Sequence, residues 1–416
     1  MKILIAAASF ASNMSGLQRH ALNLVRCLLP ESDISALHLV IAPWQVNFVQ
    51  AAALRQDARL VVHVAEMDRN SLSRNLWYYR RLPGLATQLH TDVVHLSYPM
   101  PIDAATFDCP TTVTLHDMYP YEIPMNFGFP KFIFNRAVLQ QCLRNVAAIA
   151  CVSDITLLRL KQYTSAGVWQ KALRIYNCVE AGSARDMKSP VSELQNQRFL
   201  LSVAQHRRNK NIPLLIRAFA GVLRTGQVAP DMKLVVIGIT GPETPMIRRL
   251  VSILGLAESV CFLEGVSESE LQWCYTQCEA VVSPSITEGF GLPVAEALLA
   301  GCRIVCSDIP AFREVGDEQC RFVALKEKAE ETLAAAIVAS LNDPKGTPKP
   351  LQQFSASVLA KQYLGLYRKL IFSGKPSGEC QGCSINSRSS FRKAASMKKK
   401  DALAPSLKGG DENERI

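Results

Sequence analysis

Residues 279–298 read EAVVSPSITEGFGLPVAEAL, and this stretch indicates the architecture of the whole chain. Its apolar start predicts a buried strand at 279–283 that leads into a loop. Gly289 and Gly291 allow the backbone of that loop to approach a ligand closely, and Pro293 suits the first turn of a helix. Strand, loop and helix in this order are the repeating unit of a parallel α/β sheet.

The same stretch predicts an anion site between two carboxylates. Three free amide groups, those of Phe290, Gly291 and Leu292, are expected at or just before the helix N-terminus, where anions bind. Glu288 lies on the loop and Glu296 about one turn inside the helix, so both carboxylates can face one cleft. A sugar nucleotide fits this arrangement, with its sugar hydroxyls at Glu288, its diphosphate between the acids and its ribose at Glu296.

The strand–turn–helix unit repeats on both sides of this stretch. In the first half we predict strands at 2–8, 36–42, 59–64, 92–96, 111–115, 147–152 and 173–176. In the second half we predict strands at 198–203, 232–238, 259–263, 279–283 and 303–307. Apolar spacing predicts helices at 17–29 and 354–372, and the Ser-x-x-Glu capping box that begins at Ser267 predicts a helix at 268–278. The pattern predicts an α/β chain of two doubly wound domains, with a cleft at the carboxyl ends of both sheets.

A length of 416 residues suits two domains and a tail. We predict a first domain at 1–180, a linker at 181–197, a second domain at 198–353, a last helix at 354–372 and a disordered tail at 373–416. The chain contains no run of eighteen apolar residues that would span a bilayer. The first apolar run stops at Ser9, which favours a strand over a signal peptide.

The net charge indicates which classes of partner suit the chain, and the cysteines indicate the redox state of its cellular compartment. The net charge is +10, and the tail carries nine Lys/Arg against five Asp/Glu. Such a balance favours anionic partners, either sugar nucleotides or the anionic face of a membrane, although a solvated basic surface is the alternative. Several of the thirteen cysteines lie in or beside apolar segments, which is typical of a reducing compartment. Cys380-x-x-Cys383 has no second pair nearby, so we expect no metal site there.

The segment from Glu288 to Glu296 resembles the signature of the retaining glycosyltransferases of family 4. That signature is Glu-x7-Glu with an inner Gly-Phe-Gly, and the match continues through residues 300–310 and 313–316. The resemblance covers nearly all of residues 1–372. It implies the GT-B fold: two Rossmann-like, doubly wound domains with an interdomain cleft and a C-terminal crossover helix that returns to the first domain.

The resemblance also implies a phosphate-binding strand and loop at residues 202–211. Lys210 matches the lysine of this element, where an ammonium group would stabilise the charge that builds on the diphosphate as the glycosidic bond breaks. Gln205 and Ala204 depart from the arginine and glycine of many members, and Arg207 or Arg208 is expected to supply the second positive charge. The alternative for this turn is a solvated basic surface.

Three further pieces follow the family pattern. His116, at the end of a strand, is implied to hydrogen-bond the donor sugar, while a packed or capping histidine is the alternative. Gly16 matches the glycine turn after the first strand, where the backbone approaches the donor phosphate or the acceptor. Gly238 and Gly265 lie in two strand-end turns that border the nucleotide base.

The resemblance therefore implies a retaining hexosyltransferase. It would move mannose, glucose or a similar hexose from a nucleotide-diphosphate sugar to a saccharide or lipid-linked acceptor, in surface polysaccharide or lipopolysaccharide biosynthesis. The predicted catalytic residues are His116, Lys210 and Glu288. The predicted binding residues are Gly16, Arg207, Arg208, Gly238, Gly265, Gly289, Phe290, Gly291, Leu292 and Glu296.

The resemblance implies no cofactor and no metal, because a helix dipole and Lys210 would take the place of a divalent ion. We expect no nucleic-acid partner. We expect a cytoplasmic protein with peripheral contact at the inner face of an anionic membrane. Segments 70–81 and 120–136, rich in Arg, Tyr and Phe, are expected to shape the acceptor site.

Other functions remain as alternatives. A sugar-nucleotide epimerase or a phosphorylase can share this fold. A non-catalytic sugar-nucleotide-binding protein is favoured only by Ala204 and Gln205. An NAD-dependent oxidoreductase needs Gly-x-Gly-x-x-Gly after the first strand, and the turn from Ser9 to Gly16 contains one glycine.

Overall fold

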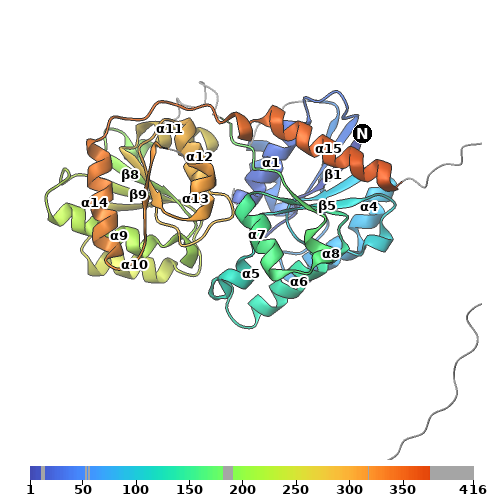
Figure 1. Ribbon diagram of the computed structural model, residues 1–416, viewed down its shortest axis with the longest axis horizontal. Coiled ribbons are helices and arrows are strands. Elements are labelled where there is room, and N and C mark those ends of the chain that lie inside the picture. The colour runs from blue at the N-terminus through green and yellow to red at the C-terminus, as the bar shows by residue number, and fades with distance from the viewer. Residues whose placement is uncertain (11–14, 52–53, 55–56, 181–190, 317, 375–416) are drawn as a thin grey trace, which may run out of the picture. The chain divides into compact units, whose positions relative to one another are not determined.

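The computed structural model describes residues 1–10, 15–51, 54, 57–180, 191–316 and 318–374 (Figure 1). Its strands form two sheets in which every described pair is parallel. The first sheet has the order β3-β2-β1-β4-β5-β6-β7, and the second has the order β10-β9-β8-β11-β12-β13. Both orders reverse direction inside the sheet, which creates a crevice at the strand ends.

The strands of the first sheet are β1 (Lys2–Ala6), β2 (Ala36–Ile41), β3 (Leu60–Val64), β4 (Val93–Leu96), β5 (Thr111–Leu115), β6 (Ala148–Cys151) and β7 (Ala172–Arg174). Those of the second are β8 (Phe199–Val203), β9 (Lys233–Ile237), β10 (Val260–Leu263), β11 (Ala280–Ser283), β12 (Ile304–Ser307) and β13 (Cys320–Val323). We call the first sheet with its helices within residues 1–180 the first lobe. The second sheet with its helices within residues 191–353 is the second lobe.

The helices of the first lobe are α1 (Gly16–Leu28), α2 (Val46–Ala51), α3 (Ser71–Arg80), α4 (Leu82–Gln88), α5 (Tyr119–Glu122), α6 (Lys131–Asn145), α7 (Asp154–Tyr163) and α8 (Ala166–Trp169). Those of the second lobe are α9 (Ile212–Arg224), α10 (Thr244–Ile253), α11 (Glu268–Gln277), α12 (Leu292–Leu299), α13 (Pro310–Val315) and α14 (Ala329–Asn342). The last helix is α15 (Ala356–Gly374).

Each sheet is covered on both faces by helices, as parallel sheets require. In the first lobe, α1 packs in the core of one face, while α3, α4, α6 and α7 pack in the core of the other. In the second lobe, α9, α10 and α14 lie on one side of β8 and β9, and α12 and α13 lie on the other (Figure 1). The confirmed fold class is therefore two doubly wound α/β lobes.

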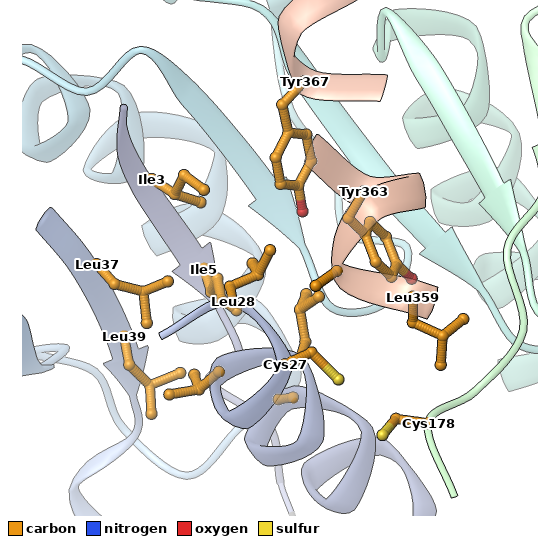
Figure 2. Packing of buried hydrophobic residues seen from close by; sticks show 14 of the residues in the cluster. Ile3, Ile5, Cys27, Leu28, Leu37, Leu39, Cys178, Leu359, Tyr363 and Tyr367 are labelled. Carbon is orange, nitrogen blue, oxygen red and sulfur yellow. The ribbon is translucent and has the colours of Figure 1, made fainter. Parts of the chain in front are cut away.

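The last helix joins the core of the first lobe, although it follows the second lobe in the chain. Leu359, Tyr363 and Tyr367 of α15 pack in one buried cluster with Cys27 and Leu28 of α1 (Figure 2). The same cluster contains the inward-facing side chains of β1 and β2. The structure therefore has a helix that crosses back to the first lobe, at Ala356–Gly374 where the sequence predicts 354–372.

The twelve predicted strands are all present, with ends within two residues of the prediction. Helices predicted at 17–29 and 268–278 are observed at Gly16–Leu28 and Glu268–Gln277. The sequence analysis missed β13, since its four residues, Cys-Arg-Phe-Val, form no continuous apolar run.

Several predictions lie wholly or largely outside the described residues. The structure does not describe residues 181–190 of the linker predicted at 181–197, residues 375–416 of the tail predicted at 373–416, or Cys380 and Cys383. The eleven cysteines that the structure describes are free thiols. Among residues 1–374, apart from the short gaps, no helix has the length and apolar character needed to cross a membrane.

Candidate active site

The candidate site lies where the second sheet reverses its strand order, between β8 and β11. Parallel strands bring the residues that follow Val203 and Ser283 to the same edge of the sheet. The first of these loops contains Lys210, and the second contains Glu288. The Lys210 ammonium lies 2.6 Å from one carboxylate oxygen of Glu288, so the two predicted catalytic residues form an ion pair.

The Glu288 carboxylate is buried, with 8% of its side chain exposed. The Ser285 hydroxyl donates to it at 2.7 Å from the same loop. Tyr119, at the start of α5 in the first lobe, donates from its hydroxyl at 3.3 Å. The carboxylate is therefore fixed by partners from both lobes, and its charge is balanced by Lys210.

A network of hydrogen bonds from side-chain amides supports the Lys210–Glu288 pair. The Asn209 side-chain amide donates to the Tyr119 hydroxyl at 3.2 Å, and the Asn126 amide donates to the Asn209 carbonyl at 3.1 Å. The backbone amide of Ile286 donates to the backbone carbonyl of Asn209 at 2.7 Å, which joins the two loops of the second sheet. The sequence predicts no individual role for any of the three: Asn126 and Asn209 lie within the predicted segments 120–136 and 202–211, and Tyr119 lies outside the predicted site segments.

The segment after Glu288 forms the predicted turn and helix. Gly291 has φ +99°, a left-handed conformation that favours glycine, and it caps α12. A Cβ at Gly291 would also lie 2.8 Å from the ring of Phe312. Among the described residues of this turn, three backbone amides donate no hydrogen bond: those of Phe290, Gly291 and Leu292. They remain available to an anion, as the sequence predicts.

The side chain of Phe290 lies in the core and not in the site. Its ring packs 5.2 Å from that of Phe354 and 6.0 Å from that of Tyr176. The predicted binding role of Phe290 is therefore confined to its backbone amide.

The second carboxylate, Glu296, lies inside α12 and is 7% exposed. One of its oxygens accepts from the guanidinium of Arg19, on α1 of the first lobe. The other accepts from the Tyr275 hydroxyl at 2.8 Å. Arg19 follows Gly16, the first residue of α1, by one turn, so the glycine turn and Glu296 are linked through this ion pair.

His116 lies at the end of β5, where the two lobes touch. Its Nε2–H donates to the backbone carbonyl of Ser97 at 2.9 Å, and burial lowers the pKa of its imidazole to about 4. The ring is therefore neutral at physiological pH, and Nδ1 carries the free lone pair. A Cβ at Gly289 would lie 1.7 Å from the carbonyl oxygen of His116, so only glycine allows this approach.

The Gly289 carbonyl is itself bound by the first lobe. The hydroxyls of Ser153 and Thr156, at the start of α7, both donate to it, the latter at 3.0 Å. The Glu314 carboxylate of α13 accepts from the backbone amides of Asp154 at 2.7 Å and Ile155 at 3.3 Å. This helix N-terminus is thus already occupied by a carboxylate.

The other predicted residues lie around this centre. Arg208 is exposed, while Arg207 is half-buried and contributes an electrostatic interaction with Asp117. Gly238 approaches the end of β8, where its Cβ would lie 2.1 Å from the Ala204 carbonyl oxygen. Gly265 has φ +70° in the turn after β10. Their roles toward a ligand remain predictions.

A cavity of about 310 Å³ is lined in part by Glu288. Residues of both lobes line it, and its polar groups are supplied by Glu122, Arg159, Thr287 and Glu288. Apolar side chains form the rest of the wall, namely Ile123, Ile155, Tyr163, Ile286, Ile309, Pro310 and Ala311. Its size is in the range of small-molecule sites.

Two family models match the chain in succession. The model described as Glycosyltransferase Family 4 matches residues 14–181, and the model described as Glycosyl transferases group 1 matches residues 184–356. The O-antigen chain mannosyltransferase B of Escherichia coli is 23% identical over 393 residues, which are 89% of this chain and 100% of that protein.

The O-antigen chain mannosyltransferase RfbU of Salmonella typhimurium is 27% identical over 205 residues. This match spans 49% of the chain and about half, 54%, of the length of RfbU. Among solved structures, Anabaena HepE in complex with UDP-glucose superposes with a TM-score of 0.61 at 15% identity, covering 90% of this chain and 97% of that one. The chain therefore belongs to the group 1/family 4 glycosyltransferases, and its two doubly wound lobes form the GT-B fold.

Proposed function

We propose that this chain transfers a hexose from a nucleotide-diphosphate sugar to a saccharide or lipid-linked acceptor. The Lys210–Glu288 ion pair beside the free amides that begin α12 carries the proposal. An ammonium group and a helix N-terminus together stabilise a diphosphate that gains charge as its bond to the sugar breaks. Glu288 would accept hydrogen bonds from the sugar hydroxyls.

Mannose is the first hexose to test, and glucose the second. Both relatives described above are named O-antigen chain mannosyltransferases, and the HepE structure contains UDP-glucose. These names support a role in surface polysaccharide or lipopolysaccharide biosynthesis. GDP-mannose and UDP-glucose are therefore the first donors to test.

We further propose that transfer proceeds with retention and without a metal. His116 is neutral, so its imidazole is suited to hydrogen bonding with the donor sugar. Lys210 and the α12 amides supply the positive potential that a divalent ion provides elsewhere. The leaving phosphate itself is then the group that assists deprotonation of the acceptor on the same face of the sugar.

The test is a transfer assay with each donor and an extract of polyprenyl-linked acceptors, read by nucleotide release and by NMR of the product. We expect release from one donor, an anomeric configuration equal to that of the donor, and full activity in EDTA. Inversion would contradict retention, and loss in EDTA would contradict metal independence. A donor converted to its epimer without transfer would favour the epimerase alternative.

The proposal includes cytoplasmic peripheral contact with an anionic membrane. Segment 124–136 carries exposed Phe129 (82%) and Met125 (67%), with Ile133 and Phe134 half-exposed beside them. The segment contains Lys131 and Arg136 and no Asp or Glu. Apolar side chains among cations suit a bilayer with anionic lipids.

Vesicle co-sedimentation tests this contact. Wild-type protein should sediment with phosphatidylglycerol vesicles more than with phosphatidylcholine vesicles, and Phe129→Ser/Phe134→Ser should reduce that binding by roughly tenfold. Phe372→Ser, which replaces another exposed phenylalanine in α15, is the matched control. Equal sedimentation of both variants would contradict a membrane role for segment 124–136.

A further inference from the structure

One face of α1 carries three polar side chains, and two of them, Arg19 and Arg26, contact the second lobe. Arg19, Asn23 and Arg26 follow at spacings of four and three residues, so they share one side of the helix. Arg19 binds Glu296, and Arg26 binds Glu268 with its guanidinium 3.1 Å from the carboxylate. Asn23 donates to the backbone carbonyl of Cys178 at 3.1 Å.

The two ion pairs on this face differ in burial. The side chains of Arg26 and Glu268 are 30% and 41% exposed, and such pairs contribute little. Those of Arg19 and Glu296 are 16% and 7% exposed. Because Glu296 is buried, removing its cation leaves a carboxylate without a charge partner.

The partners of Glu296 also fix the plane of its carboxylate. Arg19 holds one oxygen and Tyr275 the other, from helices of different lobes. An ionised carboxylate has about four lone-pair positions, so about two remain for further donors. Two vicinal hydroxyls, such as those of a ribose, match that number.

We propose that Arg19 is a positioning residue for the ribose of the donor: from the first lobe it keeps Glu296 oriented to accept the ribose hydroxyls. The inference rests on the proposed function and on the role predicted for Glu296 from the sequence, which is to bind that ribose. The inference goes beyond the proposed function, because the ribose subsite is completed only when α1 lies against α12. Ribose recognition is thereby coupled to contact between the lobes.

The test compares the affinity for a nucleoside diphosphate with that for its 2′,3′-dideoxy analogue, using UDP or GDP, whichever wild-type protein binds. Hydrogen bonds to a charged group correspond to about tenfold to 100-fold, so wild-type protein should favour the ribose form by at least about tenfold. Arg19→Gln should reduce that preference to about threefold or less, with dideoxy affinity changed by about twofold or less. The ribose preference of Arg19→Lys should lie between those of wild-type protein and Arg19→Gln, since lysine keeps the charge but not the planar guanidinium fork.

Arg26→Gln is the matched control, because it removes a cross-lobe ion pair from the same helix face. It should leave the ribose preference unchanged, and Glu296→Gln should abolish it. The inference is overturned if Arg19→Gln keeps the wild-type preference, or if it weakens both nucleotides equally, as a structural role would. It is also overturned if Glu296→Gln keeps the preference. Failure of wild-type protein to bind either nucleotide would instead contradict the proposed function.

Discussion

The two sides of the candidate site differ in charge. The side contributed by the first lobe contains three histidines, His20, His95 and His116, whose pKa values are all lowered by burial. The side contributed by the second lobe contains the charged groups Lys210, Glu288 and Glu296. A buried group of neutral histidines in the first lobe thus contrasts with the charged groups of the second lobe, where Arg19 is the first-lobe cation that binds Glu296.

The histidines belong to one buried network. The Thr114 hydroxyl bonds His20 at 3.1 Å and His95 at 2.9 Å, and the ring of His20 lies edge-on to that of His116, 4.8 Å between centroids. Tyr367 of α15 reaches the other nitrogen of His95 at 2.9 Å. This comparison fits the proposed function, in which the second lobe would bind the anionic diphosphate while the first lobe holds neutral groups beside it.

Gly289 is the point where the two sides meet, and changing it should disturb both of them. In Gly289→Ala the new methyl group would overlap the His116 carbonyl, so the lobes must separate or shift. Because a displacement of about 1 Å can cost about 100-fold in rate, we expect kcat/KM to fall by 100-fold or more. Steady-state kinetics with the active donor measures this.

Gly221→Ala is the control for that variant. Gly221 lies inside α9 of the same lobe, and no atom lies within 4 Å of its added Cβ. Alanine favours a helix interior over glycine, so stability should rise slightly with activity unchanged. Wild-type activity in Gly289→Ala would show that the contact with His116 is dispensable.

The charged side is tested by Lys210→Ala, which should lower kcat/KM by about 100-fold to 1000-fold, as loss of one stabilising donor does. It also leaves Glu288 without its cation, so stability should fall. The double variant Lys210→Ala/Glu288→Gln should recover stability but not activity. If the double variant regained activity, Lys210 would act only by neutralising Glu288, and its role toward the diphosphate would be wrong.

The neutral histidines of the first lobe predict that the folded chain loses stability as the pH falls. Between pH 6.5 and about 4, the unfolded chain protonates His95 and His116, whose native pKa values are about 3 and about 4. The unfolded state then binds more protons, so the free energy of unfolding falls as pH falls, by about 1.4 kcal/mol per pH unit for each unbalanced histidine. Burial raises the pKa of Asp117 to about 6, which offsets one such proton below pH 6.

Urea unfolding at pH 7 and pH 5 measures this slope. His20, His38, His63 and His206 also have lowered pKa values and add to this slope. The variant His116→Asn therefore isolates the contribution of one histidine. That variant should show a shallower loss of stability on acidification. Equal stability at both pH values in wild-type protein would contradict a neutral histidine network.

The smallest effect is expected at the edge of the network. Tyr367→Phe removes the hydroxyl that bonds His95 and should cost about 1–2 kcal/mol in unfolding free energy. Tyr363→Phe should cost less, because its hydroxyl lies 3.3 Å from Thr114. Donor affinity should stay within about twofold in both. A loss of donor affinity greater than about twofold in either variant would mean that α15 contributes to the site directly.

The same contrast explains what the sequence could predict. The Glu288–Glu296 segment has its glycines, proline and acids in one continuous stretch, so its strand, turn and helix could be located from local chemistry. The proximity of Lys210 and Glu288 follows from parallel strands that end at one edge of the sheet. These features are local or set by the sheet.

The contacts between the lobes could not be predicted in this way. Arg19 and Tyr119 reach Glu296 and Glu288 across 277 and 169 residues of sequence. Arg19 lies in an ordinary amphipathic helix, and its spacing resembles that of any solvated charged face. Only the packing of one lobe on the other shows which carboxylate it meets.

The most direct test of the account is donor binding by saturation-transfer NMR. The donors are GDP-mannose, UDP-glucose, UDP-galactose and UDP-N-acetylglucosamine, with wild-type protein, Lys210→Ala and Glu296→Ala. We predict that one donor binds wild-type protein selectively and that both folded variants lose most of that binding. Absence of binding to folded wild-type protein, or unchanged binding in both variants, would contradict the account.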